Sequence, residues 1–165
     1  EGKGEISIRD LVKNSLRMRP DRIVVGEVRG GETMDMLQAM NTGHEGSLTT
    51  VHANSARDAL GRLETLASMS DLELPVDTIR DQINSAIDVI VQLERDSKGV
   101  RRVRQIEAVT SERRDGYTTE PIMRYEEIPQ VGQSSFRLFR LPDVISSRIN
   151  SRGESIPGSF ERSVP

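Results

Sequence analysis

The sequence predicts an α/β fold in which a parallel sheet with helices is followed by a small antiparallel β meander. Segments of strand and helix character alternate up to about residue 95, which is typical of a parallel sheet. The segment "RIVVGEV" (22–28) is apolar without alternation, which indicates a strand covered on both faces. Two more polar strand-like segments, "GVRRVRQIEAV" and "YTTEPIMRYEEI", flank "RRDG", a turn signal that favours an antiparallel hairpin.

The first third of the chain reads as helix, strand, helix. Apolar residues at helical spacing predict a helix over 8–18, and Pro20 ends it. The strand at 22–28 comes next. "ETMDMLQAMN" (32–41) then predicts a second helix with its methionines facing the core, and Thr42-Gly43 ends that helix.

The middle of the chain continues the alternation. "GSLTTVHAN" (46–54) is rich in β-branched residues and predicts a second core strand. Ser55 and Asp58 resemble a capping box for a helix that runs to about residue 69, and Pro75 begins another helix. "DVIVQL" (88–93) predicts a third core strand. A further strand is expected at 135–140, and a tail from 142 on is expected to be ordered only in part, around "DVISSRIN".

Composition narrows the class of protein. The chain has 165 residues, of which 35% are hydrophobic and only 3% aromatic, so the core must be aliphatic. The net charge of −3 and the scarcity of aromatics speak against a nucleic-acid-binding domain. There is no cysteine, which excludes disulfides and thiolate metal sites, and no apolar run approaches the ~20 residues that span a bilayer.

Polar side chains follow two of the predicted core strands. Glu27 and Arg29 follow the first, and Thr49, Thr50 and His52 end the second. Ligands of open parallel sheets bind outside the carboxyl ends of the strands, so we expect Glu27 and His52 to share one crevice. A carboxylate there could polarise a water molecule or hold the water shell of Mg²⁺, and an imidazole could sense a phosphate.

Structural readings of the same residues stay open. A glutamate at a strand end also serves as a cap or as the partner of an arginine, and a single histidine is often a hydrogen-bonded structural residue. His44 and His52 are poorly spaced for a metal, so zinc is not expected. The glycines of "GEVRGGE" are weak evidence for phosphate binding, because glycines also serve plain turns.

In combination, two segments resemble one family. "LRMRPDRIVVGEVRGGET" followed by "TGHEGSLTTVHANSARDALGRL" is similar to the Walker B and His-box segments of the secretion ATPases, the hexameric motors of type II and type IV secretion and of type IV and tight-adherence (Flp) pili. The two segments are nearest to the tight-adherence branch, and the resemblance covers about residues 1–109.

The resemblance implies roles for five residues. Glu27 matches the Walker B glutamate, expected to activate water and to contact Mg²⁺ through a water molecule. Arg29 and Glu32 match the positions just after it, expected to contact phosphate or a neighbouring subunit. His44 and His52 match the His-box histidines, expected to sense the nucleotide.

The resemblance also implies a domain organisation. Residues 1–110 are expected to be the C-terminal portion of a RecA-like ATPase domain, residues 111–141 a β appendage and residues 142–165 a partly disordered tail. ATP and Mg²⁺ are the implied cofactors. The implied partners are further copies in a hexameric ring and an inner-membrane platform protein. The implied location is the cytoplasm, at the inner face of the cytoplasmic membrane, with peripheral membrane association only through such partners.

One departure from the family limits these expectations. No G-x-x-x-x-G-K-[ST] P-loop occurs in the sequence, and Gly2-Lys3-Gly4 lacks its other residues. We therefore expect a fragment of a pilus or secretion motor that is inactive alone. The alternative is a non-catalytic interaction module or pseudo-subunit that binds the secretion ring or its membrane platform.

Overall fold

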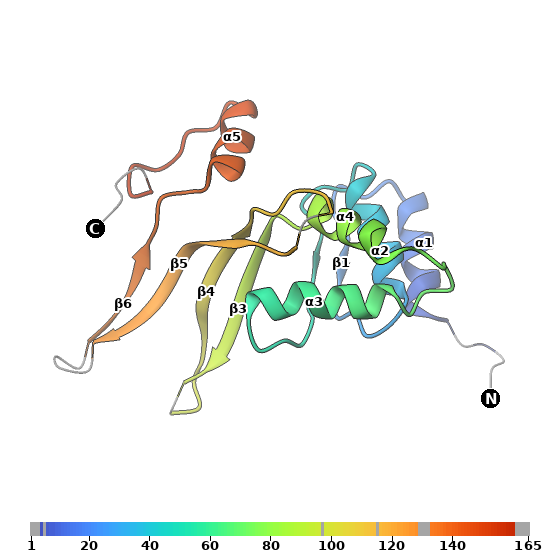
Figure 1. Ribbon diagram of the computed structural model, residues 1–165, viewed down its shortest axis with the longest axis horizontal. Helices are drawn as coiled ribbons and strands as arrows, with labels where there is room; N and C mark the ends of the chain where they lie inside the picture. Colours follow the sequence, from blue (N-terminus) through green and yellow to red (C-terminus); the bar gives the residue numbers. More distant parts are fainter. Residues whose placement is uncertain (1–3, 5, 97, 115, 129–132, 161–165) are drawn as a thin grey trace. The chain divides into compact units, whose positions relative to one another are not determined.

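A computed structural model describes residues 4, 6–96, 98–114, 116–128 and 133–160. The chain divides into two compact units, Glu1–Ala86 with Glu112–Gly116, and Ile87–Ser111 with Tyr117–Pro165. The first unit consists of helices and a short parallel strand pair, and the second is an antiparallel sheet followed by a helix (Figure 1). The first unit contains α1 (Ile8–Arg17), β1 (Val24–Val25), α2 (Glu32–Asn41), β2 (Leu48–Thr49), α3 (Ala56–Ala67) and α4 (Val76–Ala86).

Local sequence signals explain where the helices of the first unit begin. Ser7 caps α1 with a full capping box, in which its hydroxyl accepts from the Asp10 N–H and the Asp10 carboxylate accepts from the Ser7 N–H. Ser55 caps α3, where its hydroxyl accepts from the Asp58 N–H at 3.0 Å. Pro75 precedes α4, whose first turn bonds back to the Pro75 carbonyl. The predicted helices at 8–18, 32–41, 55–69 and after Pro75 are thus confirmed.

The helix α2 forms the centre of the first unit. It contacts α1, α3 and α4, and six of its residues are buried: Thr33, Met34, Met36, Leu37, Ala39 and Met40. The three helices that contact α2 also bury apolar residues: Val12 in α1, Leu60, Leu63 and Leu66 in α3, and Ile79 and Ile83 in α4. The core is therefore aliphatic and methionine-rich, as the composition requires.

Polar contacts fix the same helices at their edges. The Arg9 guanidinium joins α1 to Asp35 of α2, with Nε 2.8 Å from Oδ2. Arg80 of α4 meets Glu64 of α3, with Nε 2.9 Å from Oε2. The Asn41 amide at the end of α2 donates to the Gln82 backbone carbonyl of α4 at 3.0 Å.

The strands β1 and β2 pair in parallel, as predicted, with Val24 opposite Leu48 and Val25 opposite Thr49. The expectation that both faces of this sheet are covered is wrong for the described residues. Val25 is buried, whereas Val24 and Leu48 are 72% and 56% exposed. The reason is that the pleat sends neighbouring side chains to opposite faces, and the helices of this unit bury only one of the two.

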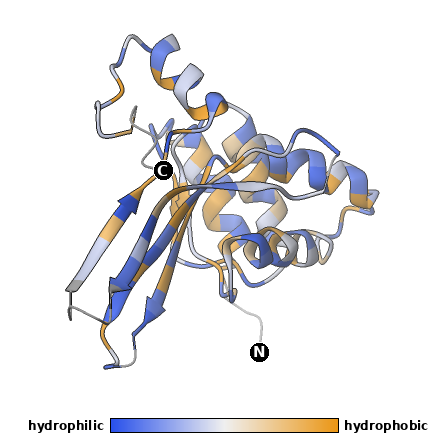
Figure 2. Ribbon diagram, turned by 60° about the vertical axis from the view of Figure 1, so that its left-hand side comes forward, coloured by the Kyte–Doolittle hydropathy of each residue, from blue (hydrophilic) through white to orange (hydrophobic). Residues whose placement is uncertain are grey.

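The second unit is a four-stranded antiparallel sheet in the order β3-β4-β5-β6. Its strands are β3 (Val89–Arg95), β4 (Arg101–Val109), β5 (Thr119–Ile128) and β6 (Gln133–Leu138), and α5 (Asp143–Ser151) follows. Figure 2 shows hydrophilic residues along much of the length of these strands, which agrees with their polar sequence. A small core of Ala108, Ile122 and Leu141 packs against partly buried apolar residues of α5 and the segment after it: Ile145, Ile149, Ile156 and Phe160.

The assignment of "DVIVQL" to the parallel sheet is wrong, because β3 is an edge strand of the antiparallel sheet. A tight turn folds β3 back onto β4: the Asp96 N–H donates to the Val100 carbonyl, and Gly99 adopts a φ of 78°. Exposed Val89, Val91 and Leu93 lie on β3, so its apolar run reflects an edge strand and not a core strand.

The other strands after residue 99 agree with the predicted meander, and "DVISSRIN" lies in α5. Residues 161–165 of the expected tail, and Asp115 of the "RRDG" turn, lie outside the described residues. The predicted boundaries at 110 and 141 stay predictions.

Gly31, the residue before α2, lies against the turn that follows α3. A Cβ added there would be 2.8 Å from the Ser70 Cα and 2.9 Å from the Met69 carbonyl oxygen. We predict that Gly31→Ala lowers the free energy of unfolding by about 1–3 kcal/mol, since neither backbone atom can move aside cheaply.

Gly61, in the interior of α3, is the matched control. An added Cβ meets nothing within 4 Å there, so Gly61→Ala should stabilise the chain by about 1 kcal/mol. Urea unfolding of both variants measures whether Gly31→Ala lowers and Gly61→Ala raises the free energy of unfolding. Equal effects of the two substitutions would contradict the close approach of Gly31 to Ser70.

Asp96 holds the β3–β4 turn through three hydrogen bonds. It accepts from Arg102 Nε at 2.7 Å and from the N–H groups of Lys98 and Val100 at 2.9 and 2.8 Å. The Arg102 guanidinium, and then the Val100 N–H, hold the pKa of the Asp96 carboxyl below its ordinary 3.8.

We predict that the ionised Asp96 carboxylate stabilises the turn fully at pH values above the ordinary pKa of an aspartate. As the pH falls through the lower pKa that Asp96 has in the folded chain, the carboxylate is protonated and this stabilisation is lost. Carboxyl NMR titration should give Asp96 a pKa below 3.8, and Arg102→Gln should raise it. A pKa of Asp96 that does not respond to Arg102→Gln would show that the pair does not persist in solution.

Candidate functional site

The candidate site lies where the parallel strands β1 and β2 end. Hydrogen bonds extend the pairing beyond the two strands: the Leu48 N–H donates to the Ile23 carbonyl, and the Val28 N–H donates to the Thr50 carbonyl. The Thr50 hydroxyl donates to the Gly26 carbonyl at 2.6 Å. These bonds align the segment that carries Glu27 with the segment that carries His52.

Three side chains meet at this end of the strand pair. Arg29 Nε donates to Glu27 Oε2 at 2.7 Å, and Arg29 Nη2 lies 2.5 Å from the same oxygen. His52 Nε2 lies 3.1 Å from Glu27 Oε1. The expectation that neighbouring strands bring Glu27 and His52 together is confirmed, whereas their roles stay predictions.

The three groups differ in exposure. The Glu27 side chain is 22% exposed, while those of Arg29 and His52 are 76% and 92% exposed. The carboxylate therefore lies beneath the arginine and the histidine, which face solvent. The Arg29 guanidinium holds the pKa of the Glu27 carboxyl below its ordinary value against the opposing effect of desolvation, and His52 adds to the lowering. Glu27 is thus ionised and can accept a hydrogen bond or a proton from a ligand that displaces a neighbour.

Glu32 contacts the backbone of the turn that comes after Glu27. Its Oε1 accepts from the Arg29 N–H at 2.7 Å and from the Gly30 N–H at 3.0 Å. The predicted contact of Glu32 with phosphate or a neighbouring subunit is untested and stays a prediction. The spacing was a signal that sequence reasoning missed, since a carboxylate three residues after Arg29 can reach back to that N–H as in a capping box.

His44 lies in the loop between α2 and β2. Its carbonyl accepts from the Ser47 hydroxyl at 2.7 Å, and the Ser47 hydroxyl accepts from the Ile23 N–H at 2.9 Å. The His44 side chain is half-buried, and its Nδ1 has no hydrogen-bond partner among the described residues. Ser47 connects this loop to β1, a contact that no sequence pattern indicated.

The donor set does not form a complete metal centre. Within the described part of the chain, no group of three His, Cys, Asp or Glu side chains is placed to hold a metal ion. Both oxygens of Glu27 already have protein partners. A metal ion or a metal-bound water at Glu27 would therefore displace Arg29 or His52 from a carboxylate oxygen, or share that oxygen with it.

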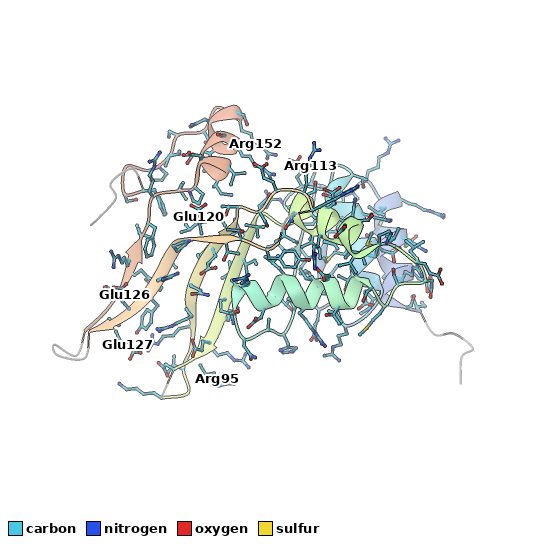
Figure 3. All side chains as sticks on the ribbon, viewed as in Figure 1. Arg95, Arg113, Glu120, Glu126, Glu127 and Arg152 are labelled. Atoms are coloured by element: carbon cyan, nitrogen blue, oxygen red, sulfur yellow. The ribbon has the colours of Figure 1, made fainter. Side chains whose placement is uncertain are left out.

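A second polar cluster lies on the antiparallel sheet. A cavity of about 290 Å³ is lined by Glu94, Arg95, Asp96, Arg102, Arg104, Tyr125 and Glu127. Figure 3 shows Arg95 and Glu127 near the same end of the sheet. Arg102 pairs with Asp96, and Arg104 Nε lies 3.6 Å from Glu94 Oε2, so these charges are matched internally and do not indicate a ligand.

Comparisons with known proteins agree with the resemblance of the two segments. Residues 1–125 match the family model described as "Type II/IV secretion system protein". A putative conjugal transfer protein of Mycobacterium tuberculosis is 47% identical over 106 residues, which are 64% of this chain and 30% of that protein. Conjugal transfer protein TrbB of Rhizobium radiobacter is 44% identical over 117 residues, 71% of this chain and 35% of that protein.

A solved structure gives the same relationship. The VirB11 ATPase from the Brucella suis type IV secretion system, in complex with sulphate, is 29% identical with a TM-score of 0.59. The match covers 62% of this chain and 32% of the VirB11 chain, which relates the fold to that of this ATPase.

Two further facts limit what these similarities show about this chain. The chain spans about a third of the length of the relatives it matches. No helix in the described ranges is long and apolar enough to cross a membrane. The match over residues 1–125 is nonetheless most of the chain, and the chain therefore belongs to the type II/IV secretion system protein family.

Proposed function

We propose that this chain is the part of a secretion ATPase that supplies the catalytic carboxylate and the nucleotide-sensing histidines, with MgATP as substrate. The observation that carries the proposal is the Glu27 cluster: a carboxylate beneath Arg29 and His52 at the ends of parallel strands, in a chain of this family. Similarity to the VirB11 ATPase supports the choice of reaction.

The chemistry proposed for each residue depends on its position. Glu27 accepts the proton of the attacking water, or holds a water molecule of the magnesium ion that enters with ATP. Arg29 and His52 are exposed and cationic or able to become so, which suits contact with phosphate oxygens. His44, with an unpartnered buried Nδ1 among the described residues, is proposed to sense the nucleotide through its loop.

The phosphate cradle is proposed to come from elsewhere, since the sequence of this chain contains no P-loop motif. We propose that the whole protein forms a hexameric ring at the cytoplasmic face of the inner membrane, docks on a platform protein there, and drives export of protein or pilin. The tight-adherence (Flp) pilus branch, whose motifs the sequence resembles, is the subtype that we propose, with a RecA-like fold for the complete domain.

We predict that Glu27→Gln reduces ATP turnover by about 10²-fold or more in a longer protein in which this segment follows a P-loop. The amide keeps the shape of the carboxylate but accepts no proton, and loss of a general base has this scale. Nucleotide affinity should stay near that of the unsubstituted protein. Phosphate release and equilibrium binding of a fluorescent nucleotide measure the two quantities.

Two controls accompany this experiment. Glu73→Gln replaces an exposed glutamate in the loop between α3 and α4 and should leave turnover unchanged. The 165-residue chain alone should release phosphate only at background rate, because it lacks the motif that holds the β- and γ-phosphates. Normal turnover in Glu27→Gln would exclude Glu27 as the base. A longer protein with no magnesium-dependent hydrolysis would favour the non-catalytic interaction module.

A further inference from the structure

The turn between Glu27 and α2 contains a carboxylate that serves the turn itself. Glu32 Oε1 accepts from two successive backbone N–H groups, those of Arg29 and Gly30. Two successive N–H groups that converge on one point form a small anion-binding concavity. In this chain a side chain of the same turn fills that concavity, so its two N–H groups are not open to an external phosphate.

The rest of the turn is adapted to this contact. A Cβ added to Gly30 would be 3.1 Å from Glu32 Oε2, so the glycine leaves room for the carboxylate. The Gly30 carbonyl accepts from the hydroxyl of the buried Thr33 at 2.7 Å. Gly31 lies directly on the backbone of Ser70 in the turn that follows α3. The backbone from Arg29 to Gly31 is therefore held from several sides.

Arg29 is the residue on which this arrangement acts. Its N–H is fixed by Glu32, while its guanidinium contacts Glu27 through Nε and Nη2. Because its side chain is 76% exposed, the position of the Arg29 backbone sets the point from which the guanidinium reaches Glu27.

We propose that Glu32 is a positioning residue that acts through the Arg29 N–H to keep the Arg29 guanidinium on Glu27. The proposal rests on the proposed function, because Glu32 would affect catalysis only through Arg29, the residue that contacts the proposed catalytic carboxylate of Glu27. The contact itself is a property of this chain, and it can be tested without ATP hydrolysis.

The first test measures hydrogen exchange of the Arg29 Nε–H by NMR in the 165-residue chain. In Glu32→Ala the exchange should be about threefold faster than in the unsubstituted chain, the modest effect expected for an exposed ion pair. Glu32→Gln should restore slow exchange, because the amide oxygen still accepts from both N–H groups. Glu27→Gln assigns the Arg29 Nε–H resonance, because this substitution weakens the acceptor of that N–H and should speed its exchange directly.

Asp10→Ala is the matched control. Asp10 is also a carboxylate in the first turn of a helix that accepts from a preceding N–H, but it belongs to α1 and does not contact the Glu27 cluster in the structure. Both alanine substitutions remove a carboxylate that accepts from backbone N–H groups preceding a helix and should lower the melting temperature, whereas only Glu32→Ala should change the Arg29 exchange rate. If Glu32→Ala does not fold, Glu32→Asp serves, because the shorter side chain cannot reach both N–H groups.

Two outcomes would overturn the proposal: unchanged Arg29 exchange in Glu32→Ala, or an equal change in Asp10→Ala. In a longer protein with a P-loop, Glu32→Ala should lower kcat with KM little changed, and Glu32→Gln should restore it. A change in Arg29 exchange in the 165-residue chain, together with no magnesium-dependent ATP hydrolysis by a longer protein in which this segment follows a P-loop, would support the positioning role and count against the proposed function. The two ideas can therefore fail separately.

Discussion

The parallel alignment of β1 with β2 is the constraint on which the candidate site depends. Only Val24–Leu48 and Val25–Thr49 pair as strand residues, but backbone bonds from Leu48 to Ile23 and from Val28 to Thr50 extend the alignment on either side. In a parallel pair both chains run the same way, so the segments after the two strands emerge at one edge. Glu27 and His52, far apart along the chain, therefore come within 3.1 Å.

Such a short strand pair is not stable in isolation, and the loops on either side of α2 connect it to the most buried helix of the unit. This helix is buried along most of its length and contacts α1, α3 and α4, so it fixes the loops at both of its ends. At its N-terminus lies the turn of Arg29, Gly30 and Gly31, and at its C-terminus lies the loop that carries His44. Arg29 and His44 thus lie on short segments that lead into and out of one well-packed helix.

The ion pairs of Glu27 with Arg29 and His52 suit a site in which these side chains exchange one binding partner for another. Glu27 is paired on one oxygen with a cation of fixed charge and on the other with a histidine, and both partners are far more exposed than the carboxylate. Exposed ion pairs are weak, so Arg29 can leave Glu27 at small cost in free energy. The antiparallel sheet presents the opposite case, because the carboxylate of Asp96 is committed to a turn by three hydrogen bonds.

Much of the secondary structure and the composition of the site could be predicted from the sequence alone. Capping residues, helical spacing and turn signals act over a few residues, so the bounds of α2 and the capping of α3 by Ser55 were predictable. The order Glu27, Arg29, Glu32, His44, His52 indicated the family, because a motif is itself a local pattern.

Tertiary structure decided the partners. The run "DVIVQL" suits a core strand or an edge strand equally well, and only its pairing with β4 assigned it to the antiparallel sheet. The exposure of Val24, the contact of Gly31 with Ser70 and the pairing of Arg29 with Glu27 likewise depend on backbone positions. Sequence determined which side chains and turns were present, whereas packing between distant segments decided which of them meet.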